Sequence, residues 1–183
     1  MILFKVNVYP VCELEIYMKK ILSLLLLLPL LFACTPEKVV AELDSHAHGI
    51  HDHDRCNMCG MMITKYPGPK GQLQLNNVEA NPSFCSTRDM FSFLLQPENA
   101  RQVNQVWVHD MAATSWEDPQ DEYFIDGKTA TYVYGTSKKA VMGPAVASFS
   151  TPEAAEKFPE EYGGAVLEFD EITIELLGEG MGH

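Results

Sequence analysis

KGQLQL at residues 70–75 alternates polar and apolar side chains, a pattern that predicts a strand with one buried face. Asn and Pro residues follow, and Ser83 is placed to cap a helix over residues 84–95, whose apolar side chains share one side. VNQVWVHDM at residues 103–111 then predicts another strand. The region from residue 61 to 111 therefore predicts the order strand, strand, helix, strand.

The second half of the chain repeats this order of expected elements. TATYVY at residues 129–134 is rich in β-branched and aromatic side chains, which favours a strand. Ser150 and Glu153 have the spacing of a capping box, which opens a short helix through Phe158. Further strands are expected at residues 145–149 and 165–169, and residues 172–177 suit a helix or a strand. Two ββαβ units packed together predict an α+β fold.

A sulfur-rich motif precedes these elements. CNMCGMM at residues 56–62 holds two thiols and three thioethers. Such soft donors suit Cu(I), whereas zinc would need further thiolate or imidazole ligands. Residues two apart in an extended segment point to the same side, so Cys59 and Met61 can both reach one ion. Cys56 and Met58 are reserve ligands, and the alternatives are a CxxC redox pair or an ordinary disulfide.

A third sulfur ligand is expected from far along the chain. Met142 lies in VMGP at residues 141–144, a loop of turn-forming residues without an obvious helix face to fill. As a ligand it would trap Cu(I) between the two halves of the domain, and otherwise it would fill a gap in the core, as Met usually does. His109 is another reserve ligand, and its alternative is a strand histidine that bonds its neighbours.

The beginning of the chain is expected to be an export signal. A basic MKK at residues 18–20 and a leucine-rich run lead to LFAC, which resembles a bacterial lipobox and would make Cys34 the lipidated first residue. Residues 1–17 carry acidic side chains where a signal needs basic ones, so residues 1–33 are expected to be a non-native start plus a signal peptide. Thr35 favours an outer-membrane destination, with the protein facing the periplasm.

Residues 34–55 are expected to form a polar tether, residues 56–177 the folded domain and residues 178–183 a tail. HAHGIHDHD at residues 46–54 holds four of the six His, which could capture or relay metal or could belong to a solvated linker. The formal net charge is -12, and removal of residues 1–33, with three Lys and two Glu, makes it -13. This acidity argues against a nucleic-acid partner and against electrostatic attraction to anionic lipids.

The cysteine count points to a free or metal-bound thiol. Of five cysteines, Cys12 and Cys34 are set aside with the leader and the lipid, which leaves Cys56, Cys59 and Cys85. Exported chains usually pair their thiols, and an odd number leaves at least one unpaired. A bound metal would protect such a thiol from oxidation. Whether Cys56 pairs with Cys85 stays open.

Several blocks of the sequence resemble the NosL family of lipoprotein copper chaperones. They run in order over residues from about 56 to 170, nearly the whole domain that follows the tether. The blocks include CGM at 59–61, GPKGQ at 68–72, FCSTRD at 84–89, VHDM at 108–111, ATYVYG at 130–135 and VMGP at 141–144.

The resemblance implies a fold and a function. It implies a pair of ββαβ units similar to organomercurial lyase, in a binding protein without enzymatic activity. Such a protein binds one Cu(I) and delivers it for the copper-sulfide centre of nitrous oxide reductase. Its implied partners are that enzyme and its maturation machinery, and an N-terminal lipid attaches it to the membrane. The C-x-M of the family maps onto Cys59 and Met61. Its later Met-Gly maps onto Met142 and Gly143, whereas the extra Cys56 departs from the pattern.

Other function classes stay open beside this one. CxxC in an exported protein suits a thiol–disulfide oxidoreductase, although PGP at residues 67–69 follows where such a motif would continue into a helix. The histidines of residues 46–54 suit a zinc or nickel scavenger. An organomercurial lyase activity would rest on similarity of fold alone. No catalytic residues are assigned.

Overall fold

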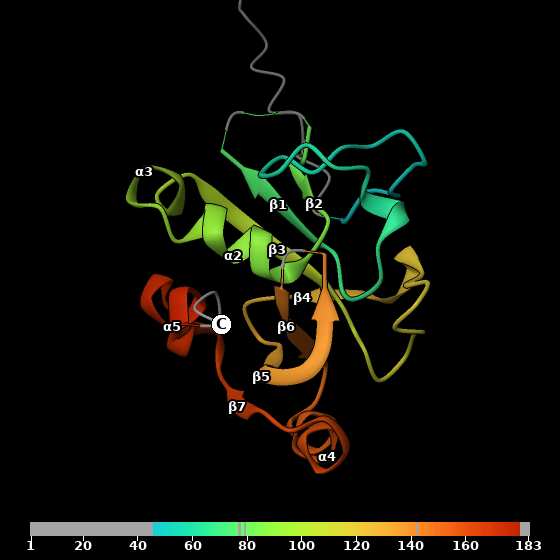
Figure 1. The fold of residues 1–183 in the computed structure, drawn as a ribbon. Coiled ribbons are helices and arrows are strands. Elements are labelled where there is room, and N and C mark those ends of the chain that lie inside the picture. Colours follow the sequence, from blue (N-terminus) through green and yellow to red (C-terminus); the bar gives the residue numbers. More distant parts are fainter. Residues whose placement is uncertain (1–45, 77, 79, 142, 180–183) are drawn as a thin grey trace, which may run out of the picture. The chain divides into compact units, whose positions relative to one another are not determined.

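Two antiparallel sheets organise the folded part of the chain (Figure 1). The computed structural model describes residues 46–179 except positions 77, 79 and 142, and these residues belong to one compact unit. The first sheet has the order β2-β1-β3-β4, formed by Ser83–Phe84, Gly71–Leu75, Val103–His109 and Phe124–Asp126. The second has the order β6-β5-β7, formed by Gly143–Phe149, Thr131–Ala140 and Ala165–Leu167.

The elements follow the same order around both sheets. β1 and β2 are followed by α2 (Thr87–Leu94) and β3, and β5 and β6 are followed by α4 (Pro152–Tyr162) and β7. The remaining helices are α3 (Pro97–Ala100), α5 (Ile174–Glu179), and the 3-10 helices η2 (Ile63–Lys65), η3 (Asp121–Tyr123) and η4 (Phe169–Glu171). The predicted α+β class is confirmed. The likeness to organomercurial lyase stays a prediction.

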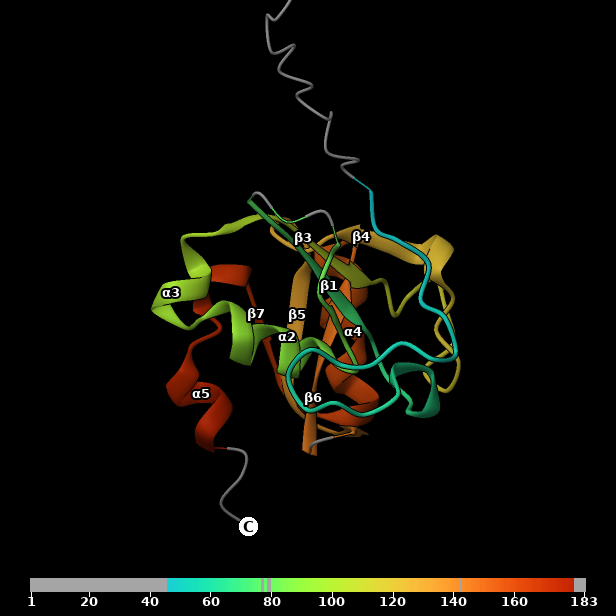
Figure 2. The same ribbon diagram turned by 90° about the horizontal axis from the view of Figure 1, so that it is seen from above.

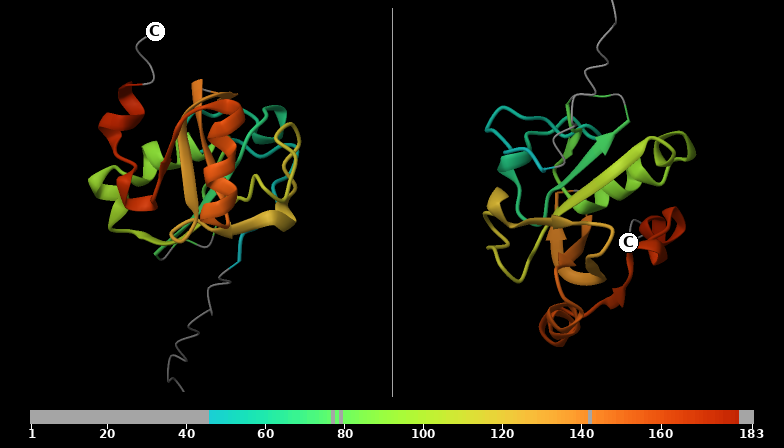
Figure 3. Two further views of the ribbon diagram at one scale, coloured as in Figure 1. Left: turned by 90° about the horizontal axis from the view of Figure 1, so that it is seen from below. Right: turned by 180° about the vertical axis from the view of Figure 1, so that it is seen from behind.

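Side chains of β5 alternate between two apolar cores. Tyr132 and Tyr134 belong to the main core, where the ring of Phe91 from α2 meets the ring of Tyr132 edge-on at 5.1 Å. Val133, between them, packs in a smaller cluster with Ala155 of α4. The second sheet is therefore packed on both faces, and α4 covers the face that is turned away from α2 (Figure 3, left).

Helix α2 lies where the two sheets meet. The hydroxyl of Thr87 donates a hydrogen bond to the backbone carbonyl of Val146 in β6. On the other side, Gly71 of β1 lies so close to α2 that a Cβ there would be 2.5 Å from the sulfur of Met90. Only a glycine allows this approach, so the helix is held against both sheets.

Two helices begin later than the sequence predicts. Ser86 rather than Ser83 caps α2, because Ser83 belongs to β2 and pairs with β1. Thr151 rather than Ser150 caps α4, and its hydroxyl accepts a hydrogen bond from a backbone N–H of the first turn. That helix runs four residues past its predicted end and stops at Gly163, whose φ of 68° few other residues adopt.

The last elements differ from the predicted strands in one respect. The strand predicted at residues 165–169 ends at Leu167, because Phe169 turns into η4 and packs on Phe91 with ring centroids 5.4 Å apart. Residues 172–177, for which helix and strand were both open, enter helix α5. Among the helices of the described ranges, none has the length and apolar character needed to cross a bilayer.

Residues 46–55, for which the sequence predicts part of a tether, lie against the first sheet (Figure 2). The backbone of His48 donates to the Gln72 side chain at 2.8 Å and accepts from it at 2.6 Å. The Ile50 N–H donates to the Asp121 carboxylate at 2.6 Å, and the Ile50 side chain packs against the main core. The buried side-chain amide of Gln72 hydrogen-bonds both the N–H and the carbonyl of His48, as a neighbouring strand would. These bonds hold the polar segment in place.

Candidate metal centre

The CxxC motif lies in the turn of a narrow loop. The N–H of Cys56 donates to the carbonyl of Met61 at 2.8 Å, and the N–H of Ile63 donates to the carbonyl of Asp54 at 3.1 Å. Gly60 closes the turn through its N–H, 2.9 Å from the carbonyl of Cys56, and its φ of 74° is one that glycine adopts easily. The two cysteines of the motif therefore stand on a hairpin-like loop and not at the start of an α-helix.

Helix α2 brings two further candidate ligands to this loop. Cys85 directly precedes the cap of α2, and Asp89 lies in its first turn, with its carboxylate 3.3 Å from the Cys85 sulfur. The N–H of Asn57 donates to the carbonyl of Ser83 at 2.9 Å, which ties the loop to the strand that leads into α2. Local structure thus fixes the loop and the helix start side by side.

Three thiols and one carboxylate converge at this point. One ligand atom from each of Cys56, Cys59, Cys85 and Asp89 lies within 4.8 Å of the other three. The Cys59 and Cys85 sulfurs are 3.4 Å apart, and the Asp89 carboxylate is 3.3 Å from Cys85 Sγ and 3.6 Å from Cys56 Sγ. All three cysteines are free, so the pairing of Cys56 with Cys85 that the sequence left open is absent from the described structure.

Hydrogen bonds within the cluster separate the proton affinities of its thiols. The hydrogen bond from Cys85, with help from backbone groups of the loop, lowers the pKa of Cys56 to about 6 despite its burial. The same interaction, burial and the nearby Asp89 charge raise the pKa of Cys85. Burial also raises the pKa of Cys59. At neutral pH the metal-free cluster thus holds one thiolate, and a metal that binds more sulfurs must displace protons.

A cavity of about 450 Å³ borders the cluster on the side of Cys59. Cys59 is half-buried, whereas Cys56 and Cys85 are buried. Met58 also lines the cavity and is 50% exposed. An ion would therefore meet solvent and partners at Cys59 first.

The structure brings some of the predicted ligands together and leaves others apart. Cys59 and the reserve ligand Cys56 belong to the cluster, and Met58 lies beside it. Met61 is half-buried, and its backbone hydrogen-bonds the Cys59 sulfur. Met142 lies outside the described residues, as does Cys34.

His109, the other reserve ligand, lies outside the cluster. It is fully buried, its Nδ1 accepts a hydrogen bond from the Lys70 N–H at 3.1 Å, and its ring stacks on Phe124 at 4.0 Å. Its Nε2 is 3.4 Å from the Asp121 carboxylate. Burial lowers its pKa. These neighbours make it the strand histidine of the alternative interpretation, which holds the end of β3 against β1 and η3.

Cys85 and Asp89 are the members of the cluster that the sequence did not assign as ligands. In the sequence, Cys85 is one of three thiols of which at least one is free or metal-bound, and both residues lie in the FCSTRD block at 84–89, where neither has an assigned role. The available signal was their spacing of four residues at the start of a predicted helix, which places two side chains on one face. Nothing in the sequence shows that this face meets the CxxC loop.

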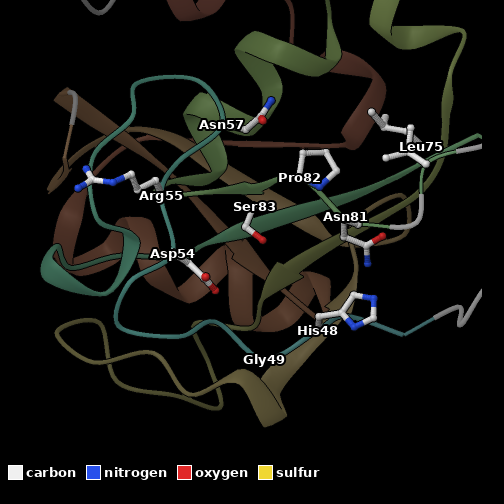
Figure 4. A pocket seen from close by; sticks show the side chains of 11 residues that line it. His48, Gly49, Asp54, Arg55, Asn57, Leu75, Asn81, Pro82 and Ser83 are labelled. Carbon is white, nitrogen blue, oxygen red and sulfur yellow. The ribbon is translucent and has the colours of Figure 1, made fainter.

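The histidine-rich segment does not form a comparable group. His51 and His53 stack at 5.8 Å on the surface. His48 lines a second cavity, of about 570 Å³, whose lining contains no sulfur (Figure 4). Within residues 46–179, apart from the three omitted positions, the thiol cluster is the group of His, Cys, Asp and Glu close enough to hold a metal.

The fold and the site define a small α+β domain built around a cluster of free thiols and one carboxylate. The NosL family model matches residues 47–177, and the chain belongs to the NosL family. The copper-binding lipoprotein NosL of Stutzerimonas stutzeri is 45% identical over 130 residues, which cover 70% of this chain and 67% of the relative. That of Achromobacter cycloclastes is 33% identical over 122 residues, or 65% of this chain and 63% of the relative.

A solved structure supports the same relation. The crystal structure of the copper chaperone NosL from Shewanella denitrificans is 46% identical, has a TM-score of 0.70, and is matched over 72% of this chain and 98% of that chain. These relatives carry the names of binding proteins and of a chaperone, which agrees with the expectation that this chain is not an enzyme.

Proposed function

We propose that this protein binds one Cu(I) ion at the thiol cluster and acts as a copper chaperone. The carrying observation is the convergence of Cys56, Cys59 and Cys85 within 4.8 Å, all free and next to methionines. In this proposal Cys59 is the central ligand, because it is the thiol nearest the open cavity. Met61 and Met142 stay the candidate thioether ligands.

The donor set supports a soft monovalent ion. Thiolate and thioether sulfur favour Cu(I), and the low pKa of Cys56 supplies one thiolate at neutral pH. Relatives named as copper-binding support the same metal. Asp89 gives zinc a fourth ligand beside three thiols, so zinc is the competing occupant of this site.

An anaerobic titration of residues 34–183, with Cys34→Ala to prevent lipidation, tests the metal. Cu(I) and Zn(II) are each added against a chromophoric chelator. We expect one tight Cu(I), with binding weakened by about 100-fold or more in Cys59→Ser, since a first ligand is lost. Met111→Leu, which changes a methionine in the smaller core, is the control. Unchanged Cu(I) binding in Cys59→Ser would refute the site.

We further propose delivery of this copper for the copper-sulfide centre of nitrous oxide reductase, together with that enzyme's maturation machinery. Family membership supports this client, and a half-buried ligand at a cavity supports release to a partner. Mixing the Cu(I)-loaded chain with metal-free nitrous oxide reductase and a source of sulfide should load the enzyme, as read from its visible spectrum. Transfer that free Cu(I) matches in rate and yield would contradict a chaperone role.

A lipid on Cys34 is the proposed attachment to the bacterial envelope, at the outer membrane and facing the periplasm. The lipobox and relatives named lipoproteins support it. Labelled palmitate should enter the wild-type chain and not Cys34→Ala when both are expressed in a bacterial host. Equal labelling of the two would disprove attachment at this residue.

A thiol–disulfide oxidoreductase is less well supported. Its CxxC motif is expected at the start of a helix that lowers a thiol pKa, whereas here the motif turns in a loop and only the three-residue η2 follows. A negligible rate of insulin reduction by the reduced protein would separate the two functions.

A further inference from the structure

Cys59 and Cys85 are placed to form a disulfide bond with each other. Their sulfurs are 3.4 Å apart, and both thiols are free. The S–S bond of a disulfide is about 2.05 Å long, so the two sulfurs would have to approach by about 1.4 Å. Small rotations of the two side chains can close this distance. Oxidation of the pair therefore needs only a local change in the fold.

The backbone holds the two cysteines opposite each other. The N–H of Asn57, in the loop that carries Cys59, donates to the carbonyl of Ser83 at 2.9 Å, two residues before Cys85. The carbonyl of Cys85 accepts a hydrogen bond from the Lys70 ammonium at 3.2 Å. Because both backbone segments are anchored in this way, the two sulfurs stay close together in the metal-free protein.

Cys56 is the alternative partner of Cys59, as the other half of the CxxC motif. It lies in the same turn, and its N–H and its carbonyl are both hydrogen-bonded within the loop. A bond from Cys59 to Cys56 would close a ring of only four residues inside this hydrogen-bonded turn. A bond to Cys85 joins two separate segments and leaves the turn intact. The geometry therefore favours Cys85.

An oxidant can reach the pair from the side of Cys59. Cys59 is half-buried and lines the cavity of about 450 Å³, in which Met58 is 50% exposed. Cys85 is fully buried. Cys59 is therefore the sulfur that meets an external disulfide first, and Cys85 can complete the exchange from inside.

We propose that Cys59 and Cys85 of the metal-free protein form a disulfide, and that this bond switches off Cu(I) binding. The inference rests on the proposed copper site. Cys59 attacks the disulfide of an external oxidant, whose S–S bond breaks, so that a mixed disulfide forms and one thiol leaves. Cys85 then attacks the Cys59 sulfur and displaces the second thiol. The oxidant gains two electrons, and the two cysteine protons leave with the two released thiols.

Oxidation and copper binding exclude each other at this pair. A disulfide sulfur is no longer a thiolate ligand, so the oxidised cluster keeps Cys56 as its one thiol. A bound Cu(I) occupies the same sulfurs and protects them from the oxidant. The protein then accepts copper only after a dithiol partner has reduced the disulfide.

The test uses residues 34–183 with Cys34→Ala, which leaves three cysteines in the sequence. The metal-free protein is incubated with excess glutathione disulfide, separated from it and unfolded for a thiol count. We expect the count to fall from three to one, and mass spectrometry of proteolytic peptides to find Cys59 joined to Cys85 without retained glutathione. In a chelator competition without oxygen, the Cu(I) affinity should fall by about 100-fold or more. Reduction with dithiothreitol, followed by its removal, should restore the affinity.

Two matched variants test which cysteine is the partner of Cys59. Cys56→Ser keeps the proposed pair and should lose both of its thiols to glutathione disulfide. Cys85→Ser keeps the CxxC motif and should retain both. One equivalent of Cu(I), added to the parent before the oxidant, should slow the loss of thiols by about tenfold or more.

The outcomes separate the switch from the copper site. Three thiols that persist in the parent, or a Cu(I) affinity that oxidation leaves unchanged, would overturn the switch alone. A Cys56–Cys59 bond in the peptides of the parent would place the disulfide within the CxxC motif and overturn the pair proposed here. A reduced parent that binds no Cu(I) overturns the copper site, and the switch with it. Peptide mapping of the parent decides the pairing even if a variant fails to fold.

Discussion

Lys70 illustrates how single residues support the thiol cluster. Its side chain is 3% exposed, and its ammonium donates to the carbonyls of Tyr66, Pro67 and Cys85, the last at 3.2 Å. Burial lowers its pKa to about 8, so it still carries a charge at neutral pH. This charge links the segment after η2 to the backbone of Cys85.

Replacing Lys70 by Met should lower the free energy of unfolding by about 2 kcal/mol, because one buried and two half-buried carbonyls lose a charged donor. Urea denaturation of the metal-free protein measures the change. Lys65→Met, at an exposed position of the 3-10 helix η2, should change the free energy of unfolding little. Equal stability of Lys70→Met and the parent would mean that the buried ammonium is not needed.

Cys56 predicts a pH dependence of stability. Its pKa is about 6 in the folded metal-free chain and 9.0 when unperturbed, so between these values the folded state binds fewer protons than the unfolded state. The contribution to stability therefore rises from about pH 6 upward and is lost as the pH falls through 6. Relative to Cys56→Ser, the metal-free parent should gain stability between about pH 6 and 8, by less than about 1.4 kcal/mol per pH unit. If the free energy of unfolding changes with pH equally in the two proteins, the thiolate assignment is contradicted.

At the scale of elements, substitutions at the N-terminal caps of the two longer helices distinguish an effect on stability from an effect on metal binding. Ser86 caps α2, which positions Cys85 and Asp89, and Thr151 caps α4, which packs on the other face of the second sheet. Ser86→Ala and Thr151→Ala should each lower the free energy of unfolding by about 1 kcal/mol. Only Ser86→Ala should weaken Cu(I) binding in the chelator assay. An equal loss of affinity in both would show that α2 has no special role.

Strands were easier to predict from this sequence than helix starts. The strand predicted at 103–111 is confirmed over Val103–His109, because its run of β-branched and aromatic residues is a property of the segment itself. The predicted cap at Ser83 is wrong, because Ser83 and Ser86 have the same local chemistry. The choice between them depends on the pairing of β2 with β1, which a local pattern does not contain.

Prediction of the metal site from the sequence is limited in the same way, because a local pattern does not contain tertiary contacts. Cys56 and Cys59 are neighbours in the sequence, so their joint role is readable from it. Cys85 and Asp89 join them only because the Asn57 backbone bonds β2 and the Ser86 cap turns α2 toward the loop. Residues 46–55 read as a linker for a similar reason, since their partners Gln72 and Asp121 are far along the chain.

At the scale of the whole molecule, the cluster joins the loop at residues 54–63 to the start of α2, and α2 joins the two sheets. A metal that binds only the folded state stabilises it, by about 2.7 kcal/mol at a concentration 100 times its Kd. Anaerobic Cu(I) should therefore raise the midpoint of thermal unfolding and slow the hydrogen exchange of the Gly60 and Ile63 amides. In Cys59→Ser both changes should be much smaller at the same Cu(I) concentration, because the variant binds the ion more weakly. A rise of the midpoint equal to that of the parent would place the metal elsewhere.

Because residues 46–55 pack on the first sheet, only the residues before them can separate the folded domain from the membrane. If Cys34 carries the lipid, twelve residues, 34–45, separate the bilayer surface from the first described residue. Even at full extension they cannot exceed about 40 Å. An enzyme that receives copper from this protein must then come close to the membrane. A shorter segment at residues 34–45 would prevent copper transfer to enzymes that stay away from it.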